Sequence, residues 1–165
     1  MSAGKDLSVT PYGTEAMHLL RAEKGYVIVG QDSDGSLTPD DLGVGGMVST
    51  RKDFLGKRSL SREYTARADR KQLVGLLTEE PAEVLPEGGQ IVEGDASGIP
   101  MPMLGHVTSS YLSAKLGRSI AFAVLKDGRR RTGDAVYVPL ADGRRIKATI
   151  TGTVFYDPEG ERQNV

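Results

Sequence analysis

The sequence predicts an α+β fold in which a helical region precedes six short strands that form a small antiparallel barrel or sandwich. Helix start and stop signals occur before residue 70, and short apolar runs separated by Gly and Pro follow it. Gly accounts for 21 of the 165 residues, about twice the usual share, which indicates many tight turns.

The most clearly marked helix spans residues 13–25. Thr14 is placed to cap its first turn, and Gly25 is placed to end it. Helical spacing puts Glu23 on a mostly apolar face of this helix. Composition alone favours a structural role for such a carboxylate, in which it pairs with a nearby Lys or Arg or caps a backbone group.

Three further elements are predicted before residue 70. The apolar run Tyr26–Val29, closed by Gly30, predicts a strand. A capping hydroxyl at Thr38, followed by Pro39 and two carboxylates, predicts the start of a second helix. Residues 53–63 form a short helix in this prediction, although they contain a glycine, which is a poor helix former.

The second half of the chain predicts six extended segments joined by turns. Asp142-Gly143 is a good hairpin turn because both residue types tolerate positive φ, and Asp127-Gly128 is a second such corner. The predicted strands are Gln72–Thr78, Gly89–Val92, Leu104–Ser109, Ser119–Leu125, Ala135–Leu140 and Arg144–Val154.

Composition excludes several classes of protein. Lys and Arg number 21 and Asp and Glu 22, and this net charge of −1 argues against a general nucleic-acid binder. There is no Cys, and His18 and His106 are the two histidines, so neither a thiolate nucleophile nor a Cys- or His-rich metal centre is expected. No apolar run reaches the length of a membrane span. We therefore expect a soluble, cytoplasmic protein that binds neither nucleic acid nor membrane.

Charge is distributed unevenly along the chain. Residues 51–71 hold eight basic and three acidic residues, whereas residues 79–95 hold six acidic residues and no basic one. Two solvated faces of opposite sign would explain this pattern. The alternatives are an anion site near Arg51 and Lys52, or two patches that meet other chains.

No catalytic constellation can be assembled from these residues. His106 and Thr108 alternate along one predicted strand, so we expect His106 to occupy a wall position rather than to act as a general base. The glycine-rich segment 43–46 lacks the Lys of a phosphate-binding loop and is expected to form a turn.

Several motifs in series resemble the folate-binding aminomethyltransferase (T-protein) family, with matches in order from Pro11 to Tyr156. In the first half these are Leu20-Arg21-Ala22-Glu23-Lys24-Gly25, then Gly30, Asp32, Thr38-Pro39 and Asp53-Phe54-Leu55-Gly56-Lys57. In the second half they are Lys71-Gln72-Leu73-Val74-Gly75-Leu76, Gly105-His106-Val107-Thr108-Ser109 and Ser119-Ile120-Ala121-Phe122-Ala123. Segments 13–17, 29–35 and 155–162 most resemble the branch formed by the α subunits of heterotetrameric sarcosine oxidases.

The resemblance implies a domain organisation. Residues 1–70 would be the C-terminal portion of a folate-binding domain, residues 71–157 a β-barrel and residues 158–165 a polar tail. The catalytic Asp of aminomethyltransferases lies upstream of the matching region, so we expect a C-terminal piece that carries no catalytic residue and is not a complete enzyme by itself.

The resemblance also implies a ligand, tetrahydrofolate, and three residues that bind it. Glu23 matches the family carboxylate that accepts hydrogen bonds from the pterin. Arg51, or Lys52 one residue later, matches the cation that holds the anionic folate tail, and Arg51 is favoured for its planar fork. Tyr156 is the nearest candidate for an aromatic contact with folate, with a core or rim position as the alternative.

The implied function is that of a sarcosine oxidase α subunit, which captures the one-carbon unit from sarcosine as 5,10-methylenetetrahydrofolate. FAD, FMN and NAD of the parent complex would be bound outside this chain. The implied partners are the remainder of the α subunit and the other subunits. The alternatives are a fragment of an aminomethyltransferase of glycine cleavage, or a non-catalytic module that packs against other subunits.

Overall fold

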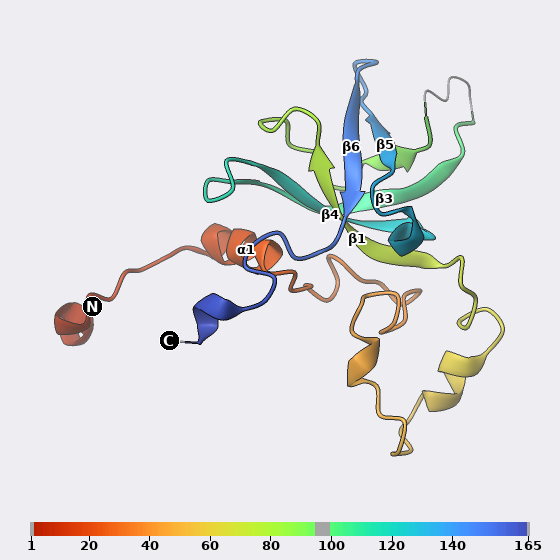
Figure 1. Cartoon of the computed structure of the whole chain (residues 1–165), viewed down its shortest axis with the longest axis horizontal. Coiled ribbons are helices and arrows are strands. Elements are labelled where there is room, and N and C mark those ends of the chain that lie inside the picture. Colours follow the sequence, from red (N-terminus) through yellow and green to blue (C-terminus); the bar gives the residue numbers. More distant parts are fainter. Residues whose placement is uncertain (1, 95–99, 165) are drawn as a thin grey trace.

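A closed barrel of six antiparallel strands dominates the structure, a computed structural model that describes residues 2–94 and 100–164 (Figure 1). The strands are β1 (Lys71–Thr78), β2 (Gln90–Val92), β3 (Met103–Ser113), β4 (Arg118–Lys126), β5 (Ala135–Pro139) and β6 (Arg145–Thr151). Their order around the barrel is β1-β4-β3-β2-β5-β6, and β1 pairs with β6 to close it. The barrel is thus confirmed, and the sandwich alternative is wrong.

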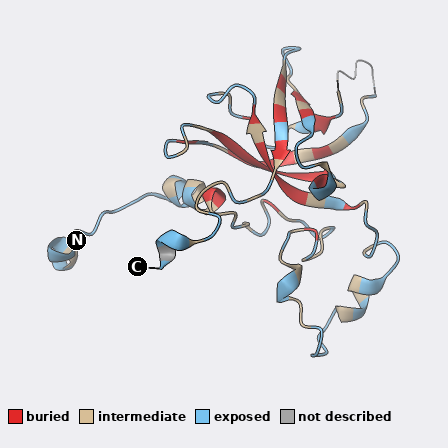
Figure 2. Cartoon of the chain, in the orientation of Figure 1, coloured by how far each residue is buried: buried red, intermediate tan, exposed pale blue. Residues whose placement is uncertain are grey.

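Strand β4 contacts both the interior of the barrel and the helical region outside it. It is buried from Ser119 to Leu125, because alternate side chains face the barrel interior and an outer apolar layer (Figure 2). The inner set is Ala121, Ala123 and Leu125, and the outer set is Ile120, Phe122 and Val124. The outer set packs with Ala22, so the helical region is attached to the outside of β4.

Two glycines permit the close approach of neighbouring backbones in the barrel. A Cβ atom on Gly105 would lie 1.9 Å from the Val124 carbonyl oxygen, and one on Gly75 would lie 2.2 Å from the Gly152 carbonyl oxygen. No side chain fits at either distance, which makes glycine a packing requirement at both positions.

The helix α1 (Thr14–Glu23) ends as the sequence predicts. Gly25 has φ +83°, and the Tyr26 amide donates to the Arg21 carbonyl oxygen at 2.9 Å, which is a Schellman ending. The predicted start is wrong by one residue. Gly13 rather than Thr14 is the N-cap, and no side chain caps the helix there.

The two other predicted helices are wrong in type. After Thr38 the chain forms a single turn, because Gly43 at φ +81° reverses the backbone. Within residues 53–63, only a short 3₁₀ segment forms, after Gly56 at φ +91°. The 3₁₀ helices are η1 (Ser2–Leu7), η2 (Gly45–Met47), η3 (Lys57–Ser61), η4 (Gly128–Arg131) and η5 (Glu161–Gln163).

The strand predicted at Tyr26–Val29 is also wrong. The segment turns instead, because the Asp32 carboxylate accepts a hydrogen bond from the Ile28 amide at 2.8 Å and the Asp32 amide donates to the Ile28 carbonyl oxygen at 2.9 Å. Val29 is 85% exposed and forms an isolated bridge with Ser33. An apolar run without a neighbouring strand has no partner for its backbone groups, so local turn bonds prevail.

Residues 45–65 extend away from the barrel and from α1, on the stretch drawn orange to yellow in Figure 1. Most side chains of this segment are exposed, in contrast to those of the barrel (Figure 2). Among the described ranges, no helix combines the length and the apolar character needed to cross a membrane.

Candidate functional site

The outer face of β3 presents three polar side chains to α1. Ser109, Tyr111 and Ser113 alternate along the strand and therefore point to the same side. Arg21 donates to the Ser109 hydroxyl at 2.8 Å and to the Tyr111 hydroxyl at 3.2 Å. The C-terminal turns of α1 are thus attached to the barrel through β3.

Glu23 lies at the last position of α1 and is 3% exposed. Its Oε1 accepts a hydrogen bond from the Ser113 hydroxyl at 2.6 Å, while Oε2 accepts none from any residue that the structure describes. Within the described chain, Glu23 also has no Lys or Arg partner. Neither structural role that composition favours, an ion pair with a nearby Lys or Arg or a cap on a backbone group, is therefore formed by the Glu23 side chain with the described residues.

Tyr156 lies beside Glu23. The Phe155 and Tyr156 amides donate to the Glu23 carbonyl oxygen at 3.0 and 2.9 Å. The Tyr156 ring has Lys115 and Arg162 near it, with the charged groups 5.7 and 5.6 Å from its centroid. The structure thus brings together two of the three residues expected to bind folate.

An ion pair fixes the segment that carries Tyr156. Lys24 Nζ lies 3.1 Å from Asp157 Oδ2 and 2.6 Å from the Asp157 carbonyl oxygen. Burial raises the pKa of Asp157, but the hydrogen bonds from Lys24 and from the Arg162 amide outweigh it and hold this pKa below its usual value. Because Lys24 directly follows α1 and Asp157 directly follows Tyr156, this ion pair joins the end of α1 to the segment that carries Tyr156.

The structure does not bring Arg51 to this group. Arg51 and Lys52 are exposed on the projecting segment 45–65, and no hydrogen bond or ion pair joins either side chain to another described residue. Lys52 lines an apolar pocket of about 490 Å³ on that segment. Within this chain, Glu23, the residue expected to contact the pterin, and Arg51, the residue expected to contact the folate tail, therefore lie in different parts of the structure.

Sequence reasoning missed the buried ion pair of Arg21 and Asp32. The Arg21 guanidinium donates to Asp32, and these side chains are 9% and 0% exposed. Asp32 also accepts from the Thr108 hydroxyl at 2.8 Å. Both residues belong to the family motifs, but their spacing in the sequence gives no sign that they meet.

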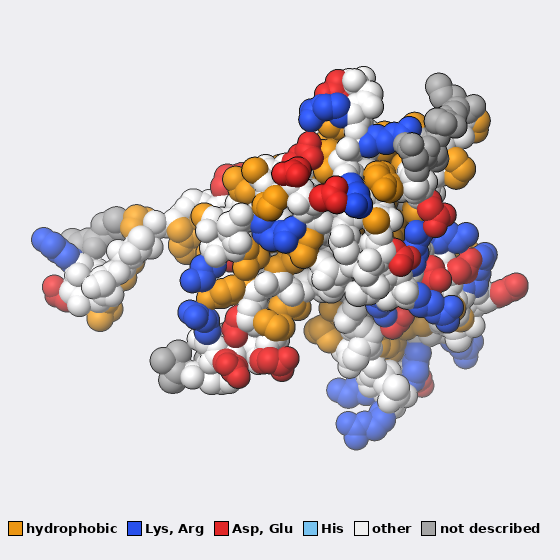
Figure 3. Space-filling view, turned by 45° about the horizontal axis from the view of Figure 1, so that its top comes forward, with side chains coloured by type: hydrophobic (Ala, Val, Ile, Leu, Met, Phe, Trp, Pro, Cys, Tyr) orange, Lys and Arg blue, Asp and Glu red, His pale blue; other side chains and the backbone are white. Residues whose placement is uncertain are grey.

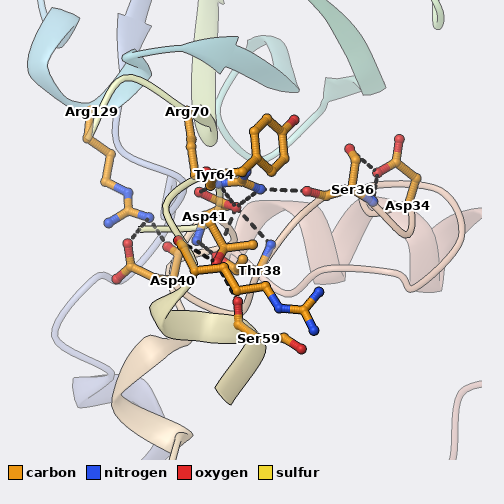
Figure 4. Close-up of polar contacts among 11 residues, drawn as sticks. Asp34, Ser36, Thr38, Asp40, Asp41, Ser59, Tyr64, Arg70 and Arg129 are labelled. Carbon is orange, nitrogen blue, oxygen red and sulfur yellow. Dashed lines mark hydrogen bonds and ion pairs between the residues drawn. The ribbon is translucent and has the colours of Figure 1, made fainter. Parts of the chain in front are cut away.

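A second buried ion pair, also missed, joins Asp41 and Arg70 (Figure 4). Arg70 reaches the Asp41 carboxylate through Nε and Nη2, at 2.9 and 2.7 Å from Oδ2, and its guanidinium lies 4.8 Å from the Tyr64 ring centroid. The Thr38 amide donates to the same carboxylate at 2.8 Å. Thr38 and Asp41 therefore form a capping turn. The Asp41 carboxylate of this turn pairs with Arg70, and no α-helix follows it among the described residues.

This environment lowers the pKa of Asp41. Burial raises the pKa, but hydrogen bonds from Arg70 and from Thr38 together outweigh burial. Asp41 is therefore an ionised carboxylate with a structural partner.

His106 occupies the wall position that its strand predicts. His106 and Thr108 line the same pocket of about 190 Å³, together with Asp32 and Asp34. Burial lowers the pKa of His106, and the charge of Lys71 lowers it further. His106 is thus part of a polar pocket wall on the outer side of β3.

The fold is a closed six-stranded antiparallel barrel with one helix held on its outer face by the polar side chains of β3. This combination defines the class of protein to which the chain belongs. Residues 71–157 match the model of the glycine cleavage T-protein C-terminal barrel domain, and residues 1–52 match that of the GCVT N-terminal domain. The chain belongs to the glycine cleavage T-protein family.

Within this family the chain is similar to sarcosine oxidase subunit alpha. It is 47% identical over 99% of its length to the subunit from Corynebacterium sp. (strain U-96), and 40% identical over 100% of its length to that from Rhizobium meliloti (strain 1021). In each case it spans 17% of the relative.

A solved structure shows the same fold. It is glycine cleavage system aminomethyltransferase T from Bartonella henselae, with a TM-score of 0.79 and 20% identity. The match covers 94% of this chain and 42% of that one.

Proposed function

We propose that this chain is the folate-binding end of a sarcosine oxidase α subunit, in which it captures the one-carbon unit from sarcosine on tetrahydrofolate. The observation that carries the proposal is the state of Glu23, a buried carboxylate with one oxygen held by Ser113 and the other without a donor among the described residues. The likeness to two sarcosine oxidase α subunits over the whole chain supports the same proposal.

The chemistry of a pterin suits such a carboxylate. The pterin ring presents an exocyclic amine and a ring N–H side by side, and both need acceptors when water is excluded. The free oxygen of Glu23 supplies a charge-assisted acceptor, and the bond from Ser113 fixes the plane of the carboxylate. A glutamine in its place would keep the shape but lose the charge.

Tyr156 and Arg51 take the remaining roles in the proposal. Tyr156 is fixed next to Glu23 by backbone hydrogen bonds, which supports a role for its ring in contacting a bound folate. Arg51, with Lys52 as the alternative cation, would meet the anionic tail of a folate that extends from Glu23 to the projecting segment 45–65, since Arg51 does not lie beside Glu23. Residues 1–70 would form the end of the folate-binding domain, residues 71–157 the barrel and residues 158–165 the tail.

In this proposal, sarcosine is oxidised outside this chain, and folate is bound by this chain. Oxidation of sarcosine to its imine is flavin chemistry, and we assign FAD, FMN and NAD to regions outside this chain. Tetrahydrofolate held by this chain would supply the two amines that take up the imine carbon as 5,10-methylenetetrahydrofolate, while the carbon–nitrogen bond of the imine breaks and the two amine protons pass to the nitrogen of the departing glycine. The contribution of this chain is to bind folate and orient it, which raises the effective concentration of the nucleophile. In this proposal the complex is a cytoplasmic heterotetramer.

Calorimetric titration of tetrahydrofolate into the intact complex tests the proposal. Glu23→Ala should weaken binding about tenfold or more, since a charge-assisted hydrogen bond contributes about 1.5–3 kcal/mol. Glu63→Ala, which removes an exposed carboxylate on the projecting segment, is the matched control and should bind as the parent does. Equal dissociation constants for Glu23→Ala and the parent complex would refute the proposal.

A further inference from the structure

The turn between β3 and β4 lies against the end of α1 (Figure 1). Strand β3 ends at Ser113 and β4 begins at Arg118. Leu116, inside this turn, packs in the same apolar cluster as Ala22 of α1. Figure 3 shows Lys, Arg, Asp and Glu side chains on the surface of the molecule, whereas Ser113 and Glu23 are buried, at 0% and 3% exposure. The turn therefore meets the proposed folate carboxylate in the interior, away from solvent.

The contacts of the Ser113 hydroxyl fix the direction of its proton. A serine hydroxyl donates one hydrogen bond and accepts up to two. The Leu116 amide donates to Ser113 Oγ at 3.0 Å, so this oxygen acts as an acceptor on the side of the turn. Glu23 Oε1 lies 2.6 Å away on the side of α1 and accepts the proton, at a distance typical of a hydroxyl bonded to a carboxylate. The turn thus orients the hydroxyl toward Glu23.

The helix by itself does not fix the orientation of the Glu23 carboxylate. The last torsion of a glutamate side chain, which rotates the carboxylate plane, has a broad two-fold preference and no sharp energy wells. Among the described residues, the Ser113 hydroxyl is the donor that bonds to this carboxylate. Loss of the hydroxyl would therefore leave the charge and the stem of the side chain in place and free the carboxylate plane to rotate.

Attachment of α1 to the barrel does not depend on Ser113. Arg21 donates to the Ser109 hydroxyl at 2.8 Å and to the Tyr111 hydroxyl at 3.2 Å. The Glu23 carbonyl oxygen accepts from two amides of the C-terminal segment, at 3.0 and 2.9 Å. These contacts hold the end of α1 with or without the Ser113 hydroxyl. A role limited to attaching the helix would be redundant, which favours a role in orienting the carboxylate.

We propose that Ser113 is a positioning residue of the folate site, which orients the Glu23 carboxylate so that the free oxygen Oε2 faces the N–H donors of the pterin. Ser113 acts through Glu23 and does not itself contact the ligand. The inference rests on the proposed folate function and adds to it the β3–β4 turn, which lies outside the family motifs in the sequence.

Calorimetric titration of tetrahydrofolate into the intact complex tests this role. Ser113→Ala should raise the dissociation constant about three- to tenfold, since the bond between the ligand and Glu23 is weakened and not removed. Ser119→Ala is the matched control and should bind as the parent does. The Ser119 side chain is 1% exposed and belongs to the same hairpin, and its hydroxyl has no hydrogen-bond partner within the described ranges. It pairs with Leu112 and so points to the face of the sheet opposite Ser113.

A double-mutant cycle separates positioning from a general structural role. In the Glu23→Ala background, Ser113→Ala should cause no further loss of folate affinity, because the carboxylate that it orients is absent. Oxygen uptake with sarcosine should be the same in all variants, while Ser113→Ala should raise the folate concentration needed for half-maximal formation of 5,10-methylenetetrahydrofolate. If Ser113→Ala does not assemble, Ser113→Cys is measured in its place. This substitution keeps the size of the side chain, offers a weaker donor and should raise the dissociation constant as well.

Two results would overturn the positioning role and leave the folate proposal standing. One is a dissociation constant that is unchanged by the Ser113 variant while Glu23→Ala weakens binding. The other is equal weakening of the parent and the Glu23→Ala complexes by the Ser113 variant, which would show an effect that does not pass through Glu23. Unchanged binding in Glu23→Ala itself would instead refute the folate proposal, and the positioning role with it.

Discussion

Arg21 on α1 and Asp32 in the following turn form an ion pair that is buried against the outer face of β3. The same two side chains bond to Ser109, and Asp32 also bonds to Thr108 and to the Ile28 amide. One pair therefore joins three parts of the fold: the helix that carries Glu23, the turn after it and the barrel.

Asp32→Ala should lower the free energy of unfolding by about 3–5 kcal/mol, because it leaves the Arg21 charge buried without its partner. Urea unfolding followed by circular dichroism measures this change. Glu63→Ala serves as the control, and its midpoint should match that of the parent chain. A change of less than about 1 kcal/mol in Asp32→Ala would show that Arg21 finds another partner or reaches water.

Acid should remove the contribution of Asp41. Because its folded-state pKa lies below the usual value, its ionised form stabilises the fold at neutral pH, and this contribution is lost as the pH falls below about 4 and through the folded pKa. The difference in unfolding free energy between the parent and Asp41→Asn should therefore be large at pH 7 and shrink below pH 4. Glu63→Gln, which changes an exposed carboxylate on the projecting segment, is the control. A difference for Asp41→Asn that is constant from pH 7 to pH 3 would contradict the assignment.

Gly105→Ala should destabilise the barrel. Its new methyl group would lie 1.9 Å from the Val124 carbonyl oxygen, so β3 and β4 must separate, at a cost of about 1–3 kcal/mol or more. Gly35→Ala is the matched control, because nothing lies within 4 Å of a Cβ atom there and its φ is not positive. Equal urea midpoints for the two variants would show that the strands yield without cost.

The barrel could be predicted from the sequence because each strand carries its own local signal. Short apolar runs and Gly-containing turns predict six strands. The observed bounds differ mainly at β6, which ends at Thr151 rather than Val154, and at β3, which continues to Ser113. That extension supplies Tyr111 and Ser113, the residues that meet α1. The end of β3 is covered by α1, and its residues show no sequence pattern that would predict an extended strand.

The first half was harder to predict because tertiary contacts, not local propensity, decide its structure. Thr38 and Asp41 form the capping bonds that the sequence predicts, yet Arg70 takes the carboxylate and Gly43 ends the turn. Tyr26–Val29 has strand composition but no neighbouring strand to pair with. Glu23 could be selected by resemblance to a family, whereas its burial and its bond to Ser113 required the structure.

The product ratio of the intact complex that carries Glu23→Gln tests the proposed folate site most directly. This substitution keeps the size of the side chain and removes only the charge offered to the pterin. With sarcosine and tetrahydrofolate present, we expect unchanged oxygen uptake and a shift of product from 5,10-methylenetetrahydrofolate toward free formaldehyde. An unchanged product ratio would show that Glu23 is a structural residue, and would contradict the assignment of the folate site to this helix.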